Sequence, residues 1–334
     1  MVSEDIKAAV AAGKLSGLHG VIATHRGEVI AEAYFPGEDE HWGFPLGSRE
    51  HGPDTLHDVR SISKSVVSLL YGIALARGEV PPIDEPLYAQ FPEYTDLGKG
   101  PGRDAIRIEH ALTMSMGTQW DETIPYTDPK NSERAMEAAD DRYRFILEQP
   151  IVTEPGTTFT YSGGATALIG RIIADGTGED IDAFAKDALF DPLGISQFEW
   201  TRGDDNVPAA ASGLRLTLPD MAKIGSLIVD DGRHGDTEVV PKAWLDASFT
   251  RRIDEPTGLG YGLSWYLSHP ALLSRWVAAF GLGGQRLLVH PDDGVVLAVH
   301  AGGYTNPDAW QIGMGLAGWF VYPAVRERMR GGIR

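Results

Sequence analysis

The pattern of apolar and polar residues predicts strands at both ends of the chain. Residues 19–35 alternate between the two kinds on either side of Arg26-Gly27, which is typical of a β-hairpin with a glycine turn. Short apolar or alternating runs, separated by turn residues, return late in the sequence at residues 262–268, 275–280, 285–290 and 295–300. Between these two regions the chain has few strand signals.

The middle of the chain predicts helices. An almost wholly apolar segment follows Ser61 and stops at Gly78 after Arg77, which indicates a buried helix with a C-terminal glycine. Further helical periodicity covers residues 106–115, 132–148, 164–175, 180–189, 219–230 and 308–328. Residues 36–55 form a polar connection, rich in glycine and proline, that leads to the Ser61 helix.

Strands at the two ends and helices between them indicate an α+β fold in which one antiparallel sheet is built from both ends of the chain. The chain is expected to form a single domain over residues 1–334. Its sheet subdomain covers about residues 1–60 and 240–334, and a mainly helical insertion covers about residues 80–240.

Composition narrows the function classes. The 334 residues include 43% hydrophobic residues and carry a formal net charge of −18, which argues against nucleic acids and anionic membrane surfaces as partners. Cysteine is absent, which excludes a thiol nucleophile. No signal peptide is recognised at the start, and no apolar run reaches about 18 residues, so a cytoplasmic location is expected. The sequence leaves the oligomeric state open.

Ser61 and Lys64 form the first candidate catalytic pair. Positions i and i+3 share one face of a helix, so the Lys64 amine can reach the Ser61 oxygen. Serine is a poor nucleophile without such a base, and a helix N-terminus favours a developing oxyanion. The alternative is a helix-capping serine with a lysine that extends out of the core to solvent.

Tyr161 is the second candidate. It ends a turn-rich loop, residues 154–164, just before an apolar helix. The pKa of a phenol lies close to that of a lysine amine, so a tyrosine beside Lys64 can relay a proton. The alternative is a loop tyrosine with its ring on the core and its hydroxyl in water.

Three segments in the same order resemble the penicillin-recognising serine hydrolase superfamily: residues 58–65 with Ser61 and Lys64, residues 155–163 with Tyr161, and Phe-Asp-Pro-Leu-Gly-Ile at 190–195. Residues 110–117 are similar to a further helix end of that family. The resemblance implies a β-lactamase/transpeptidase-like fold and a serine hydrolase that works through an acyl-enzyme. It is nearest to 6-aminohexanoate-dimer hydrolases and family VIII carboxylesterases.

The resemblance also implies residue roles. Ser61 would be the acylated nucleophile, Lys64 the base, and Tyr161 the group that returns a proton to the leaving group. Gly281 aligns with the glycine of the family's third motif. The resemblance then implies that the backbone N–H of the next residue, Leu282, binds the oxyanion together with that of Ser61.

Two departures from the family pattern bear on the substrate. Gly163 replaces an amide side chain of the second motif, and Ala279 replaces the cation of the third, which would bind a substrate carboxylate. Neither Arg275 nor Arg286 lies at the position in the third motif where the family has this cation. We therefore expect small-molecule esters or small linear amides as substrates. The candidate pocket residues are Trp120, Tyr126, Gly163 and Gly281, with residues 120–129 as a possible substrate lid.

Other chemistries have less support. His57 and Asp58 lie too near Ser61 on an extended approach to act in a Ser-His-Asp triad. The chain has no G-x-S-x-G and no H-E-x-x-H, and its histidines are scattered, so neither a catalytic metal nor a cofactor is expected. Two alternatives stay open: a weak β-lactamase or DD-peptidase, and a catalytically decayed binding or scaffold protein.

Overall fold

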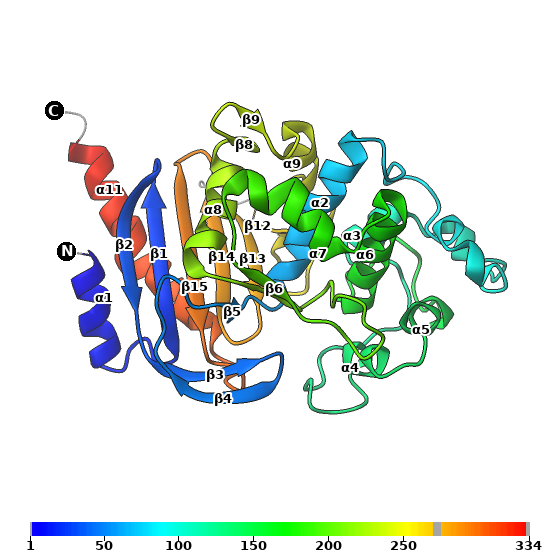
Figure 1. Cartoon of the computed structure of the whole chain (residues 1–334), viewed down its shortest axis with the longest axis horizontal. Helices are drawn as coiled ribbons and strands as arrows, with labels where there is room; N and C mark the ends of the chain where they lie inside the picture. Colours follow the sequence, from blue (N-terminus) through cyan, green and yellow to red (C-terminus); the bar gives the residue numbers. More distant parts are fainter. Residues whose placement is uncertain (1, 270–274, 332–334) are drawn as a thin grey trace.

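The computed structural model describes residues 2–269 and 275–331. Its central sheet has the order β10-β11-β12-β13-β14-β15-β1-β2, so strands from the start of the chain lie beside strands from its end (Figure 1). These strands are β1 (Leu18–His25), β2 (Glu28–Tyr34), β10 (Ile253–Asp254), β11 (Gly260–Tyr261), β12 (Tyr266–Leu267), β13 (Val277–Gly281), β14 (Gln285–His290) and β15 (Val295–Ala301). All described neighbours in the sheet pair antiparallel, which confirms the predicted α+β plan.

The hairpin of β1 and β2 turns at the predicted residues. Arg26 and Gly27 both have positive φ, 52° and 79°, which is the backbone of the two-residue turn that matches the twist of a hairpin. The predicted strand at 262–268 is wrong in one respect. Only Tyr266–Leu267 (β12) is a strand within that range. β11 ends at Tyr261, and Ser264, with a φ of 64°, lies in the turn where the chain reverses between the two strands.

The sheet separates two hydrophobic cores. On β15, Val295, Leu297 and Val299 face the core beneath the N-terminal and C-terminal helices. Val296 and Ala298 face the opposite core, which contains the Ser61 helix and the helix near residue 220. Alternate residues of a strand point to opposite faces, so the continuous apolar run of β15 supplies both cores.

Most of the predicted helices are present. Helix α2 is buried over nearly its whole length, and α8 packs on β14 and β15. The helices are α1 (Val2–Ala11), α2 (Ile62–Ala76), α3 (Ile108–Leu112), α4 (Ser132–Glu137), α5 (Arg142–Glu148), α6 (Gly163–Thr177), α7 (Ile181–Ala185), α8 (Leu218–Val229), α9 (Lys242–Ser248), α10 (Trp310–Gly315) and α11 (Tyr322–Gly331). Helices α3 to α6 gather to one side of the sheet (Figure 1).

Three predicted helices differ from a single regular α-helix. The helix expected at 180–189 continues after α7 as a π-helical turn, Lys186–Phe190. The single helix expected at 132–148 is two helices, α4 and α5, because Asp141 caps a new helix by accepting hydrogen bonds from the N–H groups of Tyr143 and Arg144. The expected terminal helix contains a π-helical turn, Leu316–Val321, between α10 and α11. None of the helices in the described ranges is both long and apolar enough to span a membrane.

Smaller sheets add structure that the sequence pattern did not predict. The polar connection forms a hairpin of β3 (Gly37–His41) and β4 (Phe44–Arg49), and a second hairpin pairs β8 (Arg233–His234) with β9 (Thr237–Glu238). A three-stranded sheet joins β5 (His57–Asp58), β7 (Leu214–Leu216) and β6 (Phe198–Trp200). Since β5 directly precedes Ser61, this sheet fixes the approach to α2.

Candidate active site

Ser61 lies at a sharp turn between β5 and α2. Arg60 has a left-handed backbone with a φ of 52°, an uncommon conformation for a residue other than glycine. Ser61 is the N-cap residue of α2, but its side chain makes no capping hydrogen bond. The hydroxyl is therefore not used to stabilise the helix, in contrast to the capping serine considered as the alternative.

The Lys64 amine is held inside the protein beside this hydroxyl. Only 2% of Lys64 is exposed, so its side chain does not reach solvent. Its Nζ lies 3.1 Å from Ser61 Oγ and 3.0 Å from the carbonyl oxygen of Ala211, to which it donates. The Oε2 atom of Glu133 lies 4.0 Å from the same nitrogen. The amine is thus oriented by three neighbours, one of which is the candidate nucleophile.

The Tyr161 ring packs against the Lys64 amine. Lys64 Nζ lies 4.8 Å from the centroid of the Tyr161 ring. Burial, followed by the charge of Glu122, raises the pKa of the Tyr161 phenol well above its usual value, and a hydrogen bond with Ser61 acts in the opposite direction. The structure therefore brings Ser61, Lys64 and Tyr161 together.

The loop before α6 positions Tyr161. The Thr160 N–H donates to the carbonyl oxygen of Met114 at 2.7 Å, which ties this loop to the end of α3. On the other side, the Ser162 hydroxyl caps α6 by accepting from the Ala165 N–H at 3.0 Å. Tyr161 is thus fixed between a backbone hydrogen bond and a helix cap, as expected for a residue that must hold one position.

Two glutamates near Lys64, the buried Glu133 and the partly buried Glu122, were not predicted from the sequence. Glu133 begins α4 and accepts a hydrogen bond from Ser212 Oγ at 2.8 Å through Oε1, while its Oε2 points toward Lys64. The charge of Glu133 acts on Glu122 and contributes to the raised pKa of its carboxyl group. Carboxyl groups are rarely buried unless paired, and no spacing rule links residues 122 and 133 to Lys64.

The predicted pocket residues Trp120 and Tyr126 hold one of these glutamates. Trp120 Nε1 donates to Glu122 Oε1 at 2.5 Å, and the Tyr126 hydroxyl donates to Oε2 at 2.8 Å. The Gly163 N–H also donates to Oε1. Both aromatic residues therefore belong to the surroundings of Tyr161. The lid function suggested for residues 120–129 stays a prediction.

Gly163 leaves space for Glu133. A side-chain carbon added at Gly163 would lie 2.6 Å from Glu133 Oε2, which is closer than atoms can approach. The sequence pattern identified Gly163 as a lost amide, but it did not show what replaces that amide. In this protein a carboxylate occupies the space, so the site is acidic where the family pattern has a neutral polar group.

The proximity of Glu122 and Glu133, called the acidic pair below, predicts how the free energy of unfolding depends on pH. Burial, followed by the charge of Glu133, raises the pKa of Glu122 to about 7. A carboxyl group with a raised folded-state pKa costs stability as pH rises from its unfolded value toward its folded value. We expect Glu122→Gln to be more stable than the wild type by about 3 kcal/mol at pH 8, and almost equal to it at pH 4. Urea unfolding at the two pH values measures this difference.

The exposed Glu327 on α11 offers a matched control for this substitution. Glu327→Gln should change the free energy of unfolding by less than about 0.5 kcal/mol at both pH values. A stabilisation by Glu122→Gln of the same size at pH 4 and pH 8 would contradict the proposed ionisation.

The third motif lies next to the turn that carries Ser61. An added side-chain carbon at Gly281, the last residue of β13, would lie 2.4 Å from the carbonyl oxygen of Val59. Leu282 follows directly. Within the described residues, neither the Ser61 N–H nor the Leu282 N–H donates to another protein group. Two backbone donors are thus available for an oxyanion.

The two arginines considered as replacements for the cation missing at Ala279 each contact another group within the described residues. Arg275 is mostly exposed and its Nε lies 3.6 Å from Asp292 Oδ2. Arg286 is buried over the ring of Phe280, with its guanidinium carbon 3.9 Å from the centroid, and it also donates to the carbonyl oxygen of Trp310. Both arginines have their own partners in the described part of the chain.

His57 and Asp58 face away from Ser61. The Nε2 atom of His57 lies 2.9 Å from Nδ1 of His19, and Asp58 Oδ1 lies 2.8 Å from Nε of Arg215. These contacts agree with the expectation that neither residue forms a triad with Ser61. His57 belongs to a separate histidine cluster, described below.

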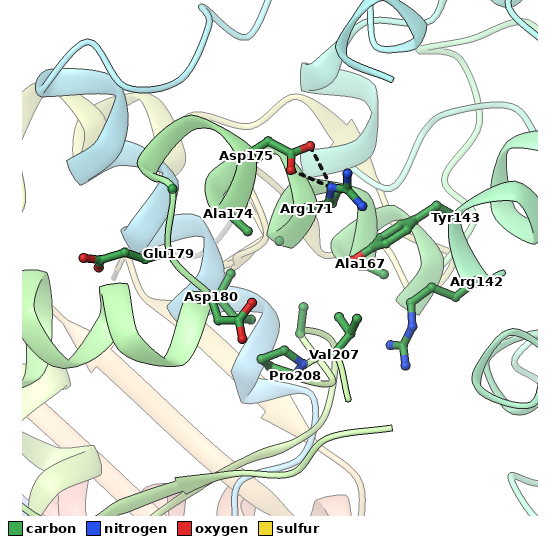
Figure 2. A pocket seen from close by; sticks show the side chains of 14 residues that line it. Arg142, Tyr143, Ala167, Arg171, Ala174, Asp175, Glu179, Asp180, Val207 and Pro208 are labelled. Atoms are coloured by element: carbon green, nitrogen blue, oxygen red, sulfur yellow. Dashed lines mark hydrogen bonds and ion pairs between the residues drawn. The ribbon is translucent and has the colours of Figure 1, made fainter. Parts of the chain in front are cut away.

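A cavity of about 390 Å³ between α5, α6 and the start of α7 contains none of the predicted site residues. Figure 2 shows the side chains that line it, with Arg171 turned toward Asp175 at a distance of 2.7 Å. Arg142 is bonded to Asp205 at 2.5 Å. Both arginines of this cavity are thus paired with carboxylates, and the lining has no serine beside a lysine amine.

Comparisons with known proteins agree with this geometry. Residues 2–311 match the family model described as Beta-lactamase. The chain therefore belongs to the β-lactamase family of serine hydrolases. No curated protein matches it.

Solved structures share the fold. One, described as a 6-aminohexanoate-dimer hydrolase from Bacillus anthracis, has 14% identity and a TM-score of 0.78, covering 97% of this chain and 82% of its own. EstCE1, a hydrolase with promiscuous acyltransferase activity, has 16% identity and a TM-score of 0.71, with coverages of 95% and 97%. A penicillin-binding protein homologue from Caulobacter crescentus has 19% identity and a TM-score of 0.68, with 90% of each chain covered.

Proposed function

We propose that this protein hydrolyses carboxylic esters or small linear amides through an acyl-enzyme on Ser61. The observation that carries the proposal is the buried Lys64 amine, 3.1 Å from Ser61 Oγ and beside the Tyr161 ring. A nucleophile and a base within hydrogen-bonding distance, with the base oriented by other groups, is the arrangement that activates a serine. The hydrolases among the structural neighbours support the same class of reaction.

The reaction follows from the positions of the groups. In the reacting form of the enzyme Lys64 is a neutral amine, which takes the Ser61 proton as Oγ attacks the carbonyl carbon. The backbone N–H groups of Ser61 and Leu282 bind the resulting oxyanion. Tyr161 transfers a proton to the leaving alcohol or amine, which departs and leaves an ester on Ser61. Water then attacks that ester and gives a proton to the Tyr161 oxygen, while Lys64 returns its proton to Ser61 Oγ, which releases the acid and restores the serine.

The acidic surroundings favour an uncharged acyl group. Glu133 and Glu122 lie beside Lys64, whereas the family position for a carboxylate-binding cation holds Ala279. A substrate carboxylate would therefore meet two acidic groups and no free cation, and repulsion between like charges opposes binding. β-Lactams and D-Ala-D-Ala peptides carry such a carboxylate, so we place them below neutral esters and amides.

A matched pair of esters tests this preference. We expect kcat/KM for p-nitrophenyl hexanoate to exceed that for p-nitrophenyl hydrogen adipate, which has an acyl chain of equal length ending in a carboxylate, by at least about tenfold at pH 8. Glu133→Gln should narrow the ratio because it removes one of the two acidic groups. Release of p-nitrophenol measures both substrates.

The opposite result identifies the competing activity. Equal or faster turnover of the anionic ester, together with nitrocefin turnover faster than that of the hexanoate ester, would favour a β-lactamase. In that case the acidic pair would not set the substrate preference.

A further inference from the structure

Four of the ten histidines in the sequence meet in one buried cluster. His19 and His300 come from β1 and β15 of the central sheet, while His51 and His57 come from the segment that leads to Ser61. His19 stacks on His51 with ring centroids 4.1 Å apart, and His57 stacks on His300 at 4.5 Å. Their spacing in the sequence did not suggest this cluster.

Three of these rings present nitrogen atoms to one another. One ring nitrogen from each of His19, His51 and His57 lies within 4.8 Å of the other two. His19 Nδ1 is 2.9 Å from His57 Nε2. Ligand nitrogens about 2.0 to 2.1 Å from a tetrahedral Zn²⁺ lie roughly 3.4 Å apart, so a small adjustment of the rings would place all three around one ion.

The orientation of His57 suits a metal ligand. Its Nδ1 lies 3.0 Å from the carbonyl oxygen of Asp58, to which it can donate, and this leaves the Nε2 lone pair directed into the cluster. Metal-bound histidines usually donate their second ring N–H to a carbonyl or carboxylate in this way. Asp39 of β3 supplies negative charge, since its Oδ1 lies 3.4 Å from His57 Nε2.

Several buried polar atoms of the cluster have no hydrogen-bond partner within the described ranges. They are His51 Nε2, Asp39 Oδ2 and His300 Nε2. An unsatisfied buried polar atom costs about 1 to 3 kcal/mol, so native proteins rarely gather several in one place unless a ligand satisfies them. Asp39 and His300 are each only 4% exposed.

The backbone around His19 is shaped to hold the ring. A side-chain carbon at Gly37 would lie 2.3 Å from His19 Nε2, and one at Gly302 would lie 2.3 Å from His19 Cε1. Two glycines therefore leave the room that the His19 ring needs in this position.

We propose that His19, His51 and His57 bind one divalent transition-metal ion of the Zn²⁺ class, with the Asp39 carboxylate as its charge partner. Imidazole is a preferred ligand of such ions. The ion would join residues 37–57 to β1. Because His57 lies four residues before Ser61, the ion would also stabilise the segment that leads into α2. This role is structural and does not depend on the proposed hydrolase activity.

Cobalt titration tests the site. The full-length protein, stripped with a chelator and dialysed, should bind one Co²⁺ per chain with the intense visible absorption of a tetrahedral ion, and Zn²⁺ should displace it. His51→Ala should weaken Co²⁺ binding by more than about 100-fold, the upper range for loss of an outer-shell partner alone. His51 is only partly buried, so this variant is the one least expected to disturb folding.

His234→Ala is the matched control, because His234 lies exposed on β8 and outside the cluster. It should bind Co²⁺ like the wild type. Asp39→Asn should weaken binding while circular dichroism stays unchanged. If His51→Ala fails to fold, His51→Gln replaces it in the same titration. Failure of the wild type to bind Co²⁺, or equal binding by the His51 variant and the wild type, would overturn the proposal.

Discussion

Replacing the nucleophile should remove turnover and leave the fold intact. We expect Ser61→Ala to lower kcat/KM for p-nitrophenyl butyrate by at least about 10⁴-fold, because no acyl-enzyme can form without the hydroxyl. The Ser61 side chain makes no helix-capping hydrogen bond, so its loss should change the free energy of unfolding by less than about 1 kcal/mol. Release of p-nitrophenol and urea unfolding measure the two quantities.

Ser226→Ala is the matched control for this variant. Ser226 lies on α8, away from Ser61, Lys64 and Tyr161. Its substitution by alanine also removes a serine hydroxyl, but not the one proposed to be the nucleophile. It should keep wild-type turnover. Retained activity in Ser61→Ala, with an unchanged circular dichroism spectrum, would show that another group performs the reaction.

Removing the Lys64 amine should affect both turnover and stability. Lys64→Met keeps the length of the side chain but removes the base, so we expect kcat/KM to fall by about 10³-fold or more. It also leaves Glu133, only 6% exposed, without its neighbouring cation. Loss of one partner of a buried ion pair typically costs about 3 to 5 kcal/mol, which urea unfolding would detect.

A second substitution separates the two effects. Adding Glu133→Gln to Lys64→Met removes the unpaired carboxylate, so stability should recover by about 2 kcal/mol or more while turnover stays lost. Lys242→Met on α9 is the control, since its amine is exposed and pairs with the exposed carboxylate of Asp246. It should cost less than about 1 kcal/mol. Recovery of turnover in the double variant would mean that Lys64 acts only by neutralising Glu133.

The parts of this account that sequence reasoning reached depend on local patterns. The alternation in β1 and β2 and the apolar length of α2 determine those elements, because the same residues form the contacts that stabilise them. The reach from Lys64 to Ser61 follows from helix geometry alone. Tyr161 was a candidate from its place at the end of a turn-rich loop and from the resemblance of its motif, and the fold placed its ring beside Lys64.

Features that depend on distant contacts were missed. The β3–β4 hairpin is polar in sequence, and its residues find partners far along the chain, as Trp42 does when its indole Nε1 donates to Ser212 Oγ at 3.1 Å. Glu122 and Glu133 become part of the site only because the loop before α4 and the first turn of α4 fold against Lys64 and the start of α6. Gly163 was recognised as a departure, but its consequence, space for a carboxylate, is visible only in three dimensions.

Labelling with a fluorophosphonate tests most directly whether Ser61 is the nucleophile of an enzyme. Such a probe forms a covalent bond with an activated serine oxygen, so it also separates an enzyme from a scaffold of the same fold. We predict one label per chain, located by peptide mass spectrometry on Ser61, absent from Ser61→Ala and present in Ser226→Ala. No label on the folded wild-type protein, or a label on another serine, would contradict the proposed mechanism.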